Sequence, residues 1–210
     1  MTARTQPPML ARHWGRVMSA MVTPFTAGGA LDLHAAVRLA RWLADNGNDG
    51  LVVAATTGEA STRTDEERCD LIRAVSEAVT IPVLAGTGSN DTAHTVMLTR
   101  QAQSLGAAGV LVVAPYDNRR WSRRPARTST CTPATMRSRC RCLPWARHIN
   151  AQLLDSCRFV NSEDCVYPMS IKAMLRTRGL EVGECRLPLP PTPREMQDAA
   201  RAVTAALCGQ

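Results

Sequence analysis

The stretch DGLVVAATTGEAST (49–62) joins a short apolar run to a polar turn. The run, Gly50–Ala54, is continuous and rich in Val and Leu, which is typical of a buried strand. The turn, ATTGE at 55–59, precedes a helical pattern that begins at Asp65. A buried strand that leads through a polar turn into a helix is the repeating unit of a parallel α/β sheet, and ligands of such proteins bind at this end of the strands.

The same order appears on both sides of this stretch. Ile81–Ala85 reads as a second buried strand, GTGSND (86–91) as its polar turn, and Thr92–Leu105 as the following helix. Further elements are expected at Val17–Phe25 (strand), Leu31–Asn46 (amphipathic helix) and Gly109–Ala114 (strand). Strand–helix units that recur about every 30 residues predict a parallel sheet with right-handed crossovers. We therefore expect an α/β fold with the first four βα units of a (β/α)₈ barrel.

The helix that begins at Asp65 carries a start signal. Thr64 is followed three residues later by Glu67, and each of these side chains can accept a hydrogen bond from the other's backbone N–H. Leu71, Ile72 and Val75 recur at helical spacing and are predicted to face the core.

The positive charge of the chain is local. The formal net charge is +7, but nine arginines and no acidic residue lie between Arg119 and Arg147, and the remainder has 16 basic and 18 acidic residues. Trp121 and Trp145 within this segment suggest stacking on bases as an alternative, yet no regular pattern would position them. We expect no nucleic-acid partner, only salt-dependent attraction to polyanions.

The same segment divides the chain. Residues 119–147 follow neither the period of a strand nor that of a helix, and they are expected to be irregular. Helical patterns return from Pro168 to Gly179 and over Arg194–Leu207, with an extended proline-rich connector, Arg186–Pro193, between them. We therefore expect a partial barrel at 1–118, an irregular Arg-rich segment at 119–148 and a C-terminal helical tail at 149–210.

Cysteine spacing and hydropathy indicate where in the cell the protein resides. The eight cysteines show no repeated CxxC pairs, so no metal site is predicted, and no motif for a cofactor is present. The N-terminus lacks an apolar core before Val17, and no apolar run approaches the ~20 residues of a membrane span. These features favour the cytoplasm and no membrane partner.

Several motifs together resemble the 4-hydroxy-tetrahydrodipicolinate synthase (dihydrodipicolinate synthase) family. They are AMVTPF (20–25), DGLVVAATTGEAST (49–62), PVLAGTGSNDTAHTV (82–96), GVLVVAPYDN (109–118), NSEDCVYPMSIKAMLRTRGL (161–180) and RLPLPP (186–191). TTGE followed about 30 residues later by GTGSNDTAH is a specific combination. The resemblance covers about 1–118 and 150–207.

The resemblance implies a (β/α)₈ barrel and a class I aldolase of lysine biosynthesis, a lyase of the diaminopimelate route. In the family, a lysine on a later strand forms a Schiff base with pyruvate, whose enamine attacks aspartate semialdehyde, while a threonine and two tyrosines relay protons. Thr56 takes the position of the relay threonine. Thr57, beside Gly58, takes the position of the residue that holds the pyruvate carboxylate. A helix terminus at this turn would favour the same anion.

The departures from the family concern its chemistry. The family's PYYN is here PYDN, so Asp117 replaces a relay tyrosine, and a carboxyl with an ordinary pKa near ~4 cannot imitate a phenol near ~10. The segment that carries the second tyrosine, the substrate-binding arginine and the Schiff-base lysine is missing. The one lysine of the chain, Lys172, matches a lysine of the helical tail and is expected to be a solvated surface cation. The chain as it stands is therefore predicted to be inactive, with weak pyruvate binding.

The resemblance also implies roles in regulation and assembly for residues near the second turn, GTGSND. In the family, GTGSND lies near a feedback site for lysine at a dimer interface. Asn90, His94 and Tyr116 fall there, and His94 stands where lysine-sensitive members often have glutamate, which argues against lysine feedback. A homo-oligomer is expected by the same analogy.

Two other functional readings remain open. One is a sibling pyruvate-dependent aldolase such as N-acetylneuraminate lyase, and the other is a non-catalytic barrel remnant that associates with intact relatives. For the Arg-rich segment, a shifted reading frame of a GC-rich gene or an internal deletion would explain a composition of Arg, Pro, Ser, Cys and Thr without periodicity. The sequence thus predicts a frame-damaged or internally truncated family member.

Overall fold

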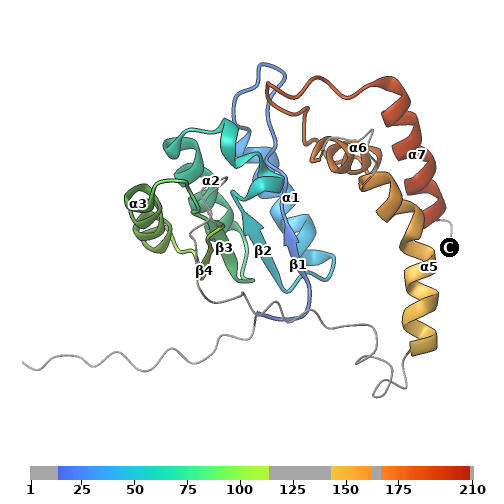
Figure 1. Ribbon diagram of the computed structural model, residues 1–210, viewed down its shortest axis with the longest axis horizontal. Coiled ribbons are helices and arrows are strands. Elements are labelled where there is room, and N and C mark those ends of the chain that lie inside the picture. Colours follow the sequence, from blue (N-terminus) through green and yellow to red (C-terminus); the bar gives the residue numbers. More distant parts are fainter. Residues whose placement is uncertain (1–13, 114–142, 162–166, 209–210) are drawn as a thin grey trace, which may run out of the picture.

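The computed structural model describes residues 14–113, 143–161 and 167–208. Strands and helices alternate through the first of these ranges, and helices alone occupy the other two (Figure 1). The strands are β1 (Met18–Ala20), β2 (Gly50–Val53), β3 (Val83–Gly86) and β4 (Gly109–Leu111). The α-helices are α1 (Leu33–Asp45), α2 (Asp65–Ala78), α3 (Thr92–Ser104), α5 (Leu143–Val160), α6 (Met169–Thr177) and α7 (Arg194–Cys208).

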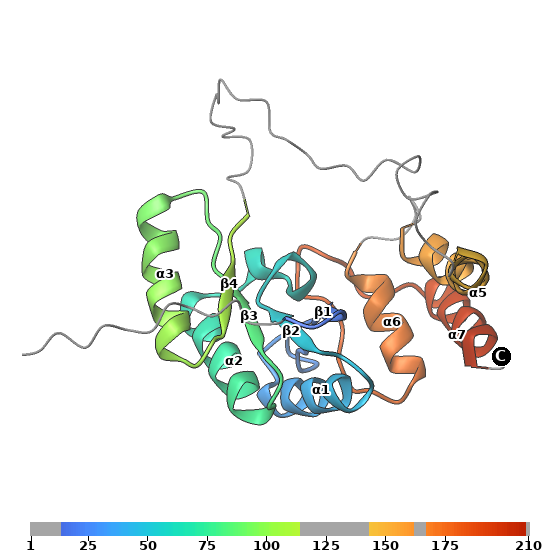
Figure 2. The ribbon, with the colours of Figure 1, turned by 90° about the horizontal axis from the view of Figure 1, so that it is seen from below.

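The four strands form one parallel sheet in the order β1-β2-β3-β4. Helices α1, α2 and α3 connect successive strands and lie along one face of this sheet (Figure 2). Each strand pairs with the next one along the chain, as the recurring strand–helix order predicts. The parallel α/β fold with the first four strands of a barrel is thereby confirmed, although β1 is shorter than the predicted Val17–Phe25.

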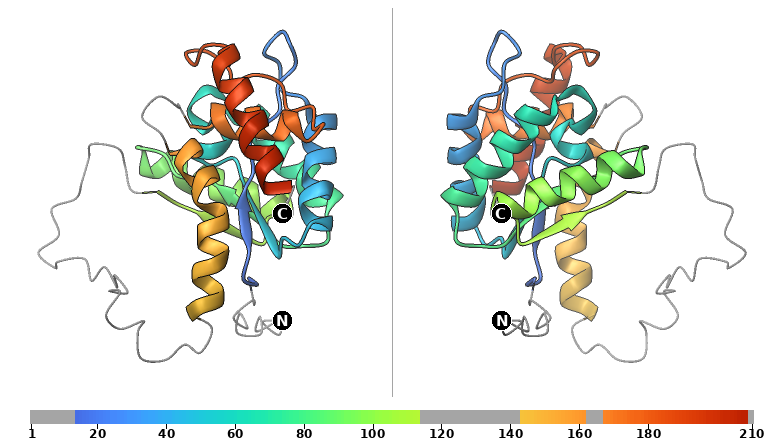
Figure 3. Two further views of the ribbon diagram at one scale, coloured as in Figure 1. Left: turned by 90° about the vertical axis from the view of Figure 1, so that its right-hand side faces the viewer. Right: turned by 90° about the vertical axis from the view of Figure 1, so that its left-hand side faces the viewer.

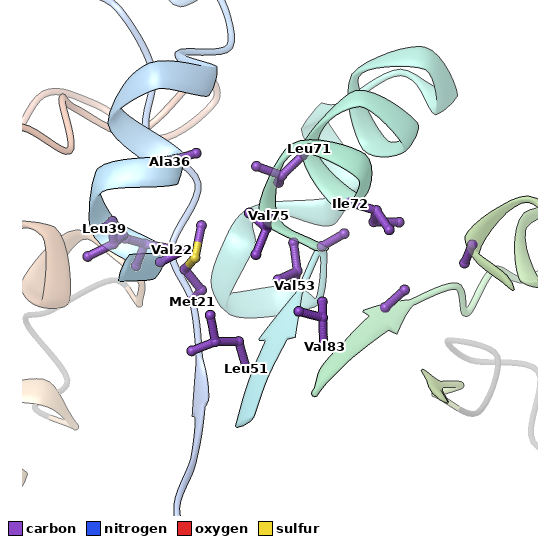
Figure 4. Packing of buried hydrophobic residues seen from close by; sticks show 14 of the residues in the cluster. Met21, Val22, Ala36, Leu39, Leu51, Val53, Leu71, Ile72, Val75 and Val83 are labelled. Atoms are coloured by element: carbon purple, nitrogen blue, oxygen red, sulfur yellow. The ribbon is translucent and has the colours of Figure 1, made fainter. Parts of the chain in front are cut away.

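The core lies between the sheet and the three helices (Figure 4). Alternate residues of β2, Leu51 and Val53, are fully buried against it, because successive side chains of a strand point to opposite faces. The predicted stripe of α2 lies in the same cluster, which includes Leu71, Ile72 and Val75. At about 1.5–3 kcal/mol for each large apolar side chain removed from water, this cluster supplies the main stabilisation of the sheet–helix layer.

The helix starts follow local chemistry. The Thr64 hydroxyl accepts from the Glu67 N–H, and the Glu67 carboxylate accepts from the Thr64 N–H, so the predicted reciprocal cap of α2 is confirmed. Asp32 caps α1 and Asp91 caps α3 by accepting backbone N–H groups. Helix α1 therefore begins at Leu33, two residues after the predicted start, and Leu31 pairs instead with Phe25 in an isolated bridge.

The C-terminal helices gather on the β1 side of the sheet, away from β4 and α3 (Figures 1 and 3). Val182, which follows α6, belongs to the main core cluster, and Ile171 and Leu175 of α6 pack against it. The Phe25 N–H donates to the Val182 carbonyl at 3.4 Å. This segment therefore extends the barrel core itself.

One expectation about an irregular segment needs correction. Leu143–Arg147, expected to be irregular, forms the first turns of α5, where Pro144 stands early in the helix and its missing N–H costs no hydrogen bond. The other residues of 119–147 lie outside the described ranges. At the two ends of the sheet, Met21 and Val22 are buried in the core cluster, whereas Val110, Leu111 and Val112 are 37–53% exposed.

Candidate functional site

The polar turn after β2 is a pair of short 3₁₀ turns, Thr56–Gly58 and Ala60–Thr62. The Gly58 N–H donates to the Ala55 carbonyl at 3.0 Å, and the Glu59 N–H donates to the Thr56 carbonyl at 2.9 Å. Helix α2 begins only at Asp65. The expectation that a helix terminus at Thr57 favours a carboxylate is therefore wrong, because the two 3₁₀ turns separate this residue from the first turn of α2.

Gly58 is held close to the first strand segment. The Thr23 hydroxyl donates to the Gly58 carbonyl at 2.7 Å, and both residues are buried. A Cβ at position 58 would lie 3.0 Å from the Thr23 hydroxyl oxygen and 3.1 Å from the Met21 carbonyl oxygen. A side chain at position 58 would therefore require these two atoms to shift by a few tenths of an ångström, and the close approach holds Thr57 next to the end of the sheet.

Thr56 and Thr57 face different surroundings. Thr57 is buried, whereas Thr56 is exposed beside a small cavity of about 20 Å³ that Gly86, Gly88 and Leu111 also line. A cavity of this size holds about one water molecule. This cavity is too small to enclose a keto acid, so a ligand of that size would contact Thr56 from its exposed side.

The buried member of this turn that sequence reasoning left without a role is Glu59. Its backbone is left-handed, with φ +57°, which is uncommon outside glycine. Its side chain is 2% exposed and forms an ion pair with Lys172, in which the Lys172 Nζ lies 2.7 Å from the Glu59 Oε1. The other carboxylate oxygen accepts from the Arg186 N–H at 2.8 Å.

Lys172 is not the solvated surface cation that the sequence suggested. Its side chain is fully buried on α6; besides Glu59, its ammonium donates to the Glu184 carbonyl at 2.8 Å and lies 4.6 Å from the centre of the Phe25 ring. Burial lowers the pKa of this ammonium, and the Glu59 carboxylate opposes that shift. Met169, Lys172 and Ala173 share the buried side of α6, a spacing of three and four residues that could have revealed the position of this lysine.

Arg186 is a second residue whose role the sequence did not show. It was assigned to an extended connector, but its guanidinium makes two hydrogen bonds to the Glu67 carboxylate, at 2.7 and 2.8 Å, and others to the Gly29 and Thr62 carbonyls. The Arg186 guanidinium also stacks over the Phe25 ring, 4.3 Å from the ring centre. The Lys172 ammonium lies over the same ring. Paired hydrogen bonds of this kind are the strongest arginine–carboxylate contacts. The C-terminal segment is thus tied to the cap of α2.

Two further arginines are buried around the turn. Arg63 donates to the Thr23 hydroxyl at 3.1 Å, but among the described residues its Nε and Nη2 have no hydrogen-bond partner. Burial, with the nearby charge of Arg68, lowers the pKa of Arg63 to about 10. Arg68 donates to the Gly86 and Ala60 carbonyls. Cations therefore outnumber carboxylates in the buried surroundings of Glu59.

Tyr167 is the residue that reaches the predicted carboxylate-binding threonine. Its phenol oxygen lies 3.0 Å from the Thr57 hydroxyl oxygen, although the two residues are 110 positions apart in sequence. Tyr167 lies two residues before the start of α6, whose docking brings it to the turn. Its sequence context, NSEDCVYPMS, shows no separate signal for this contact.

The residues of the second turn have partners of their own. The His94 Nε2 lies 2.7 Å from an Asp65 carboxylate oxygen, and its Nδ1 lies 3.2 Å from the Ser89 hydroxyl. These contacts join the start of α3 to the start of α2 and do not include Thr57. Asn90 is exposed in the same turn. Tyr116 and Asp117 lie outside the described residues.

Two kinds of feature are missing from the described ranges: a cluster of metal ligands and a helix that could span a membrane. Within residues 14–113, 143–161 and 167–208, no three His, Cys, Asp or Glu side chains converge as metal ligands. Among the helices described above, none has both the length and the apolar character that crossing a bilayer requires.

Comparison with known proteins identifies the family of this site. Residues 13–123 match the model of the dihydrodipicolinate synthetase family. A 4-hydroxy-tetrahydrodipicolinate synthase from Acidothermus cellulolyticus is 58% identical over 105 residues, which cover 49% of this chain and 34% of that protein. The corresponding enzyme of Kineococcus radiotolerans is 55% identical over 120 residues, which cover 56% and 38%. The matched part thus spans little more than a third of these relatives.

Solved structures show the same fold. The structure of dihydrodipicolinate synthase from Cyanidioschyzon merolae with lysine bound aligns with a TM-score of 0.79 at 24% identity, over 93% of this chain and 98% of that one. Because the family model matches more than half of the 210 residues, the chain belongs to the dihydrodipicolinate synthetase family.

Proposed function

We propose that this chain is a non-condensing member of its family, which holds a small carboxylate such as pyruvate weakly and does not form a Schiff base with it. The observation that carries the proposal is the burial of Lys172. It is the single lysine of the sequence, and its ammonium is occupied by Glu59 and the Glu184 carbonyl. Schiff-base formation requires an uncharged amine that a carbonyl substrate can reach.

The ancestry of the site supports an aldolase-type lyase of lysine biosynthesis. The matched relatives are 4-hydroxy-tetrahydrodipicolinate synthases, and the family match over residues 13–123 includes the Thr56–Gly58 turn. We assign Thr57 and Gly58 to carboxylate contact and Thr56 to the former proton relay, in which Asp117 replaces a tyrosine. On the sequence pattern, we place the chain in the cytoplasm.

The expected affinity follows from the few groups present. A charge-assisted hydrogen bond from the Thr57 hydroxyl contributes ~1.5–3 kcal/mol, whereas a Kd of 1 mM already requires about 4 kcal/mol. The turn lacks the help of a helix terminus, and the cavity beside Thr56 is small. We therefore expect pyruvate to bind with a Kd above ~1 mM.

Ligand-observed NMR during a pyruvate titration tests this function. Thr57→Val removes the hydroxyl and should raise the Kd for pyruvate, while Thr57→Ser retains a hydroxyl and should raise it less. Micromolar binding, or binding that Thr57→Val leaves unchanged, would contradict the proposal.

The same titration, repeated with added lysine, tests whether lysine changes the affinity for pyruvate. The Cyanidioschyzon merolae structure has lysine bound, whereas His94 of this chain occupies a position where lysine-sensitive members often carry glutamate. We expect added lysine to leave the Kd for pyruvate unchanged, and a shift of that Kd would contradict this part of the proposal.

A second candidate function is association with another barrel of the family. The apolar side chains of Val110 and Leu111 on β4 and of Val112 directly after it are exposed, and so are those of Val96 and Met97 on α3. An exposed apolar edge strand is a template for pairing with another chain. Sedimentation velocity of the chain alone should show self-association that Leu111→Lys weakens; a monomer at all concentrations would argue against a homo-oligomer.

A further inference from the structure

The contact between Tyr167 and Thr57 joins an accessible phenol to a buried hydroxyl. Tyr167 is 43% exposed and Thr57 is 6% exposed, and their side-chain oxygens are 3.0 Å apart. This distance allows a hydrogen bond in either direction. The pair therefore lies at the boundary between the buried turn and solvent.

The number of protons in this pair decides what it presents to a ligand. Each hydroxyl has one proton to donate, so a single hydrogen bond between the two leaves one proton for a third group. A phenol is the stronger acid of the two and is the favoured donor. When Tyr167 donates to the Thr57 oxygen, the Thr57 proton turns toward another acceptor, and linked hydrogen bonds strengthen one another.

The position of the phenol is fixed by the docking of α6. Met169 and Ser170, which directly follow Tyr167-Pro168, are buried, and Lys172 one turn further on pairs with Glu59 of the same turn that carries Thr57. Tyr167 and Thr57 therefore belong to two segments that are joined by a buried ion pair as well. A donor held in place in this way binds without the cost of ordering it.

We propose that Tyr167 is a positioning residue of the carboxylate site: its phenol donates to the Thr57 oxygen and directs the Thr57 proton to the carboxylate of a small keto acid. This inference rests on the proposed binding of a carboxylate at the Thr56–Gly58 turn. In this chain the C-terminal segment thus contributes a tyrosine hydroxyl to the site from a different part of the sequence than the PYDN motif.

A double-mutant cycle with pyruvate as the probe tests the inference. Ligand-observed NMR would give the Kd for the wild-type chain, Tyr167→Phe, Thr57→Val and the double variant. We expect Tyr167→Phe to raise the Kd about threefold to tenfold, the size of one lost hydrogen bond. In the Thr57→Val background, Tyr167→Phe should have no further effect, because the phenol acts through the Thr57 hydroxyl.

Two controls separate this role from a structural one. Thermal unfolding of Tyr167→Phe should match the wild type, since the ring is retained. Thr177→Val removes a hydroxyl from the other end of α6, where it bonds to the Met174 carbonyl and Thr204, and should leave the Kd for pyruvate unchanged.

The outcomes are distinct. If Thr57→Val weakens binding and Tyr167→Phe does not, the role of Tyr167 is refuted and carboxylate binding at the turn stands. Equal effects of Tyr167→Phe with and without the Thr57 hydroxyl would also refute it. If the wild-type chain shows no pyruvate binding at all, both the proposed function and this inference fall together.

Discussion

The ammonium of Lys172 and the carboxylate of Glu59 lie 2.7 Å apart and are almost completely removed from solvent. This pair joins α6 to the turn after β2, across 113 positions of sequence. It explains why the single lysine of the chain is not available to a substrate, and it makes the C-terminal segment a part of the site.

The first prediction concerns this ion pair. Lys172→Met leaves the Glu59 carboxylate buried without its partner and should lower the free energy of unfolding by ~3–5 kcal/mol. Replacing both residues, in Lys172→Met/Glu59→Gln, should cost less than the sum of the single changes, because no unpaired charge remains. Urea unfolding of the three variants measures these differences.

An exposed ion pair supplies the matched control. The Arg38 and Glu181 side chains are 57% and 83% exposed and 2.8 Å apart. Arg38→Met should cost less than about 1 kcal/mol. Equal costs for Arg38→Met and Lys172→Met would show that the Lys172–Glu59 pair is not buried as described.

The second prediction concerns acid stability. The hydrogen bonds from Arg186 hold the pKa of the Glu67 carboxyl below its ordinary value of 4.5. A carboxyl with a depressed folded-state pKa stabilises the protein fully above its unfolded-state pKa, and this contribution is lost as the pH falls through the folded-state value. The free energy of unfolding should therefore fall below pH 4.5, and it should fall less steeply in Glu67→Gln. Identical slopes for the two proteins between neutral and acid pH would contradict this role of Glu67.

The third prediction concerns the connection between the C-terminal segment and Phe25. Gly183 has φ +65°, and a Cβ there would lie 2.0 Å from the Phe25 carbonyl oxygen. Gly179 has φ +77°, and a Cβ at position 179 would meet no other described residue within 4 Å beyond its chain neighbours. Gly179→Ala should cost only the left-handed backbone penalty of about 1–2 kcal/mol, while Gly183→Ala should cost clearly more, since Phe25 must move.

Thermal unfolding of both glycine variants, with tryptophan fluorescence as a second probe, measures this difference. A melting temperature for Gly183→Ala at or above that of Gly179→Ala would mean that the segment does not approach Phe25 as closely as described.

Sequence reasoning succeeded where the determinants are local. The order of strands and helices over 17–111 follows from apolar runs and polar turns, and the start of α2 follows from Thr64 and Glu67, three residues apart. Such features depend on hydrogen bonds and burial within one element and its neighbour, which periodicity reports directly.

The parts that sequence reasoning missed depend on contacts between distant segments. Lys172 was expected in solvent, Arg186 in a connector, and Tyr167 without a role, although all three meet the turn or the cap that follows β2. A charged side chain on a helix is usually solvated, and only the docking of α6 shows that Lys172 is an exception. The spacing of the apolar neighbours Met169 and Ala173 indicates that this side of α6 is buried, but it does not show that Lys172 pairs with Glu59.

Pyruvate and borohydride, followed by intact mass and peptide mapping, test the central claim most directly. Borohydride traps any Schiff base as a stable secondary amine. Because Lys172 is buried and paired with Glu59, the folded chain should show no adduct at this residue, whereas the same treatment in urea, which exposes the lysine, should produce one. A stable adduct mapped to Lys172 in the folded chain would contradict the account, because it would show that the amine is accessible and able to condense with a keto acid.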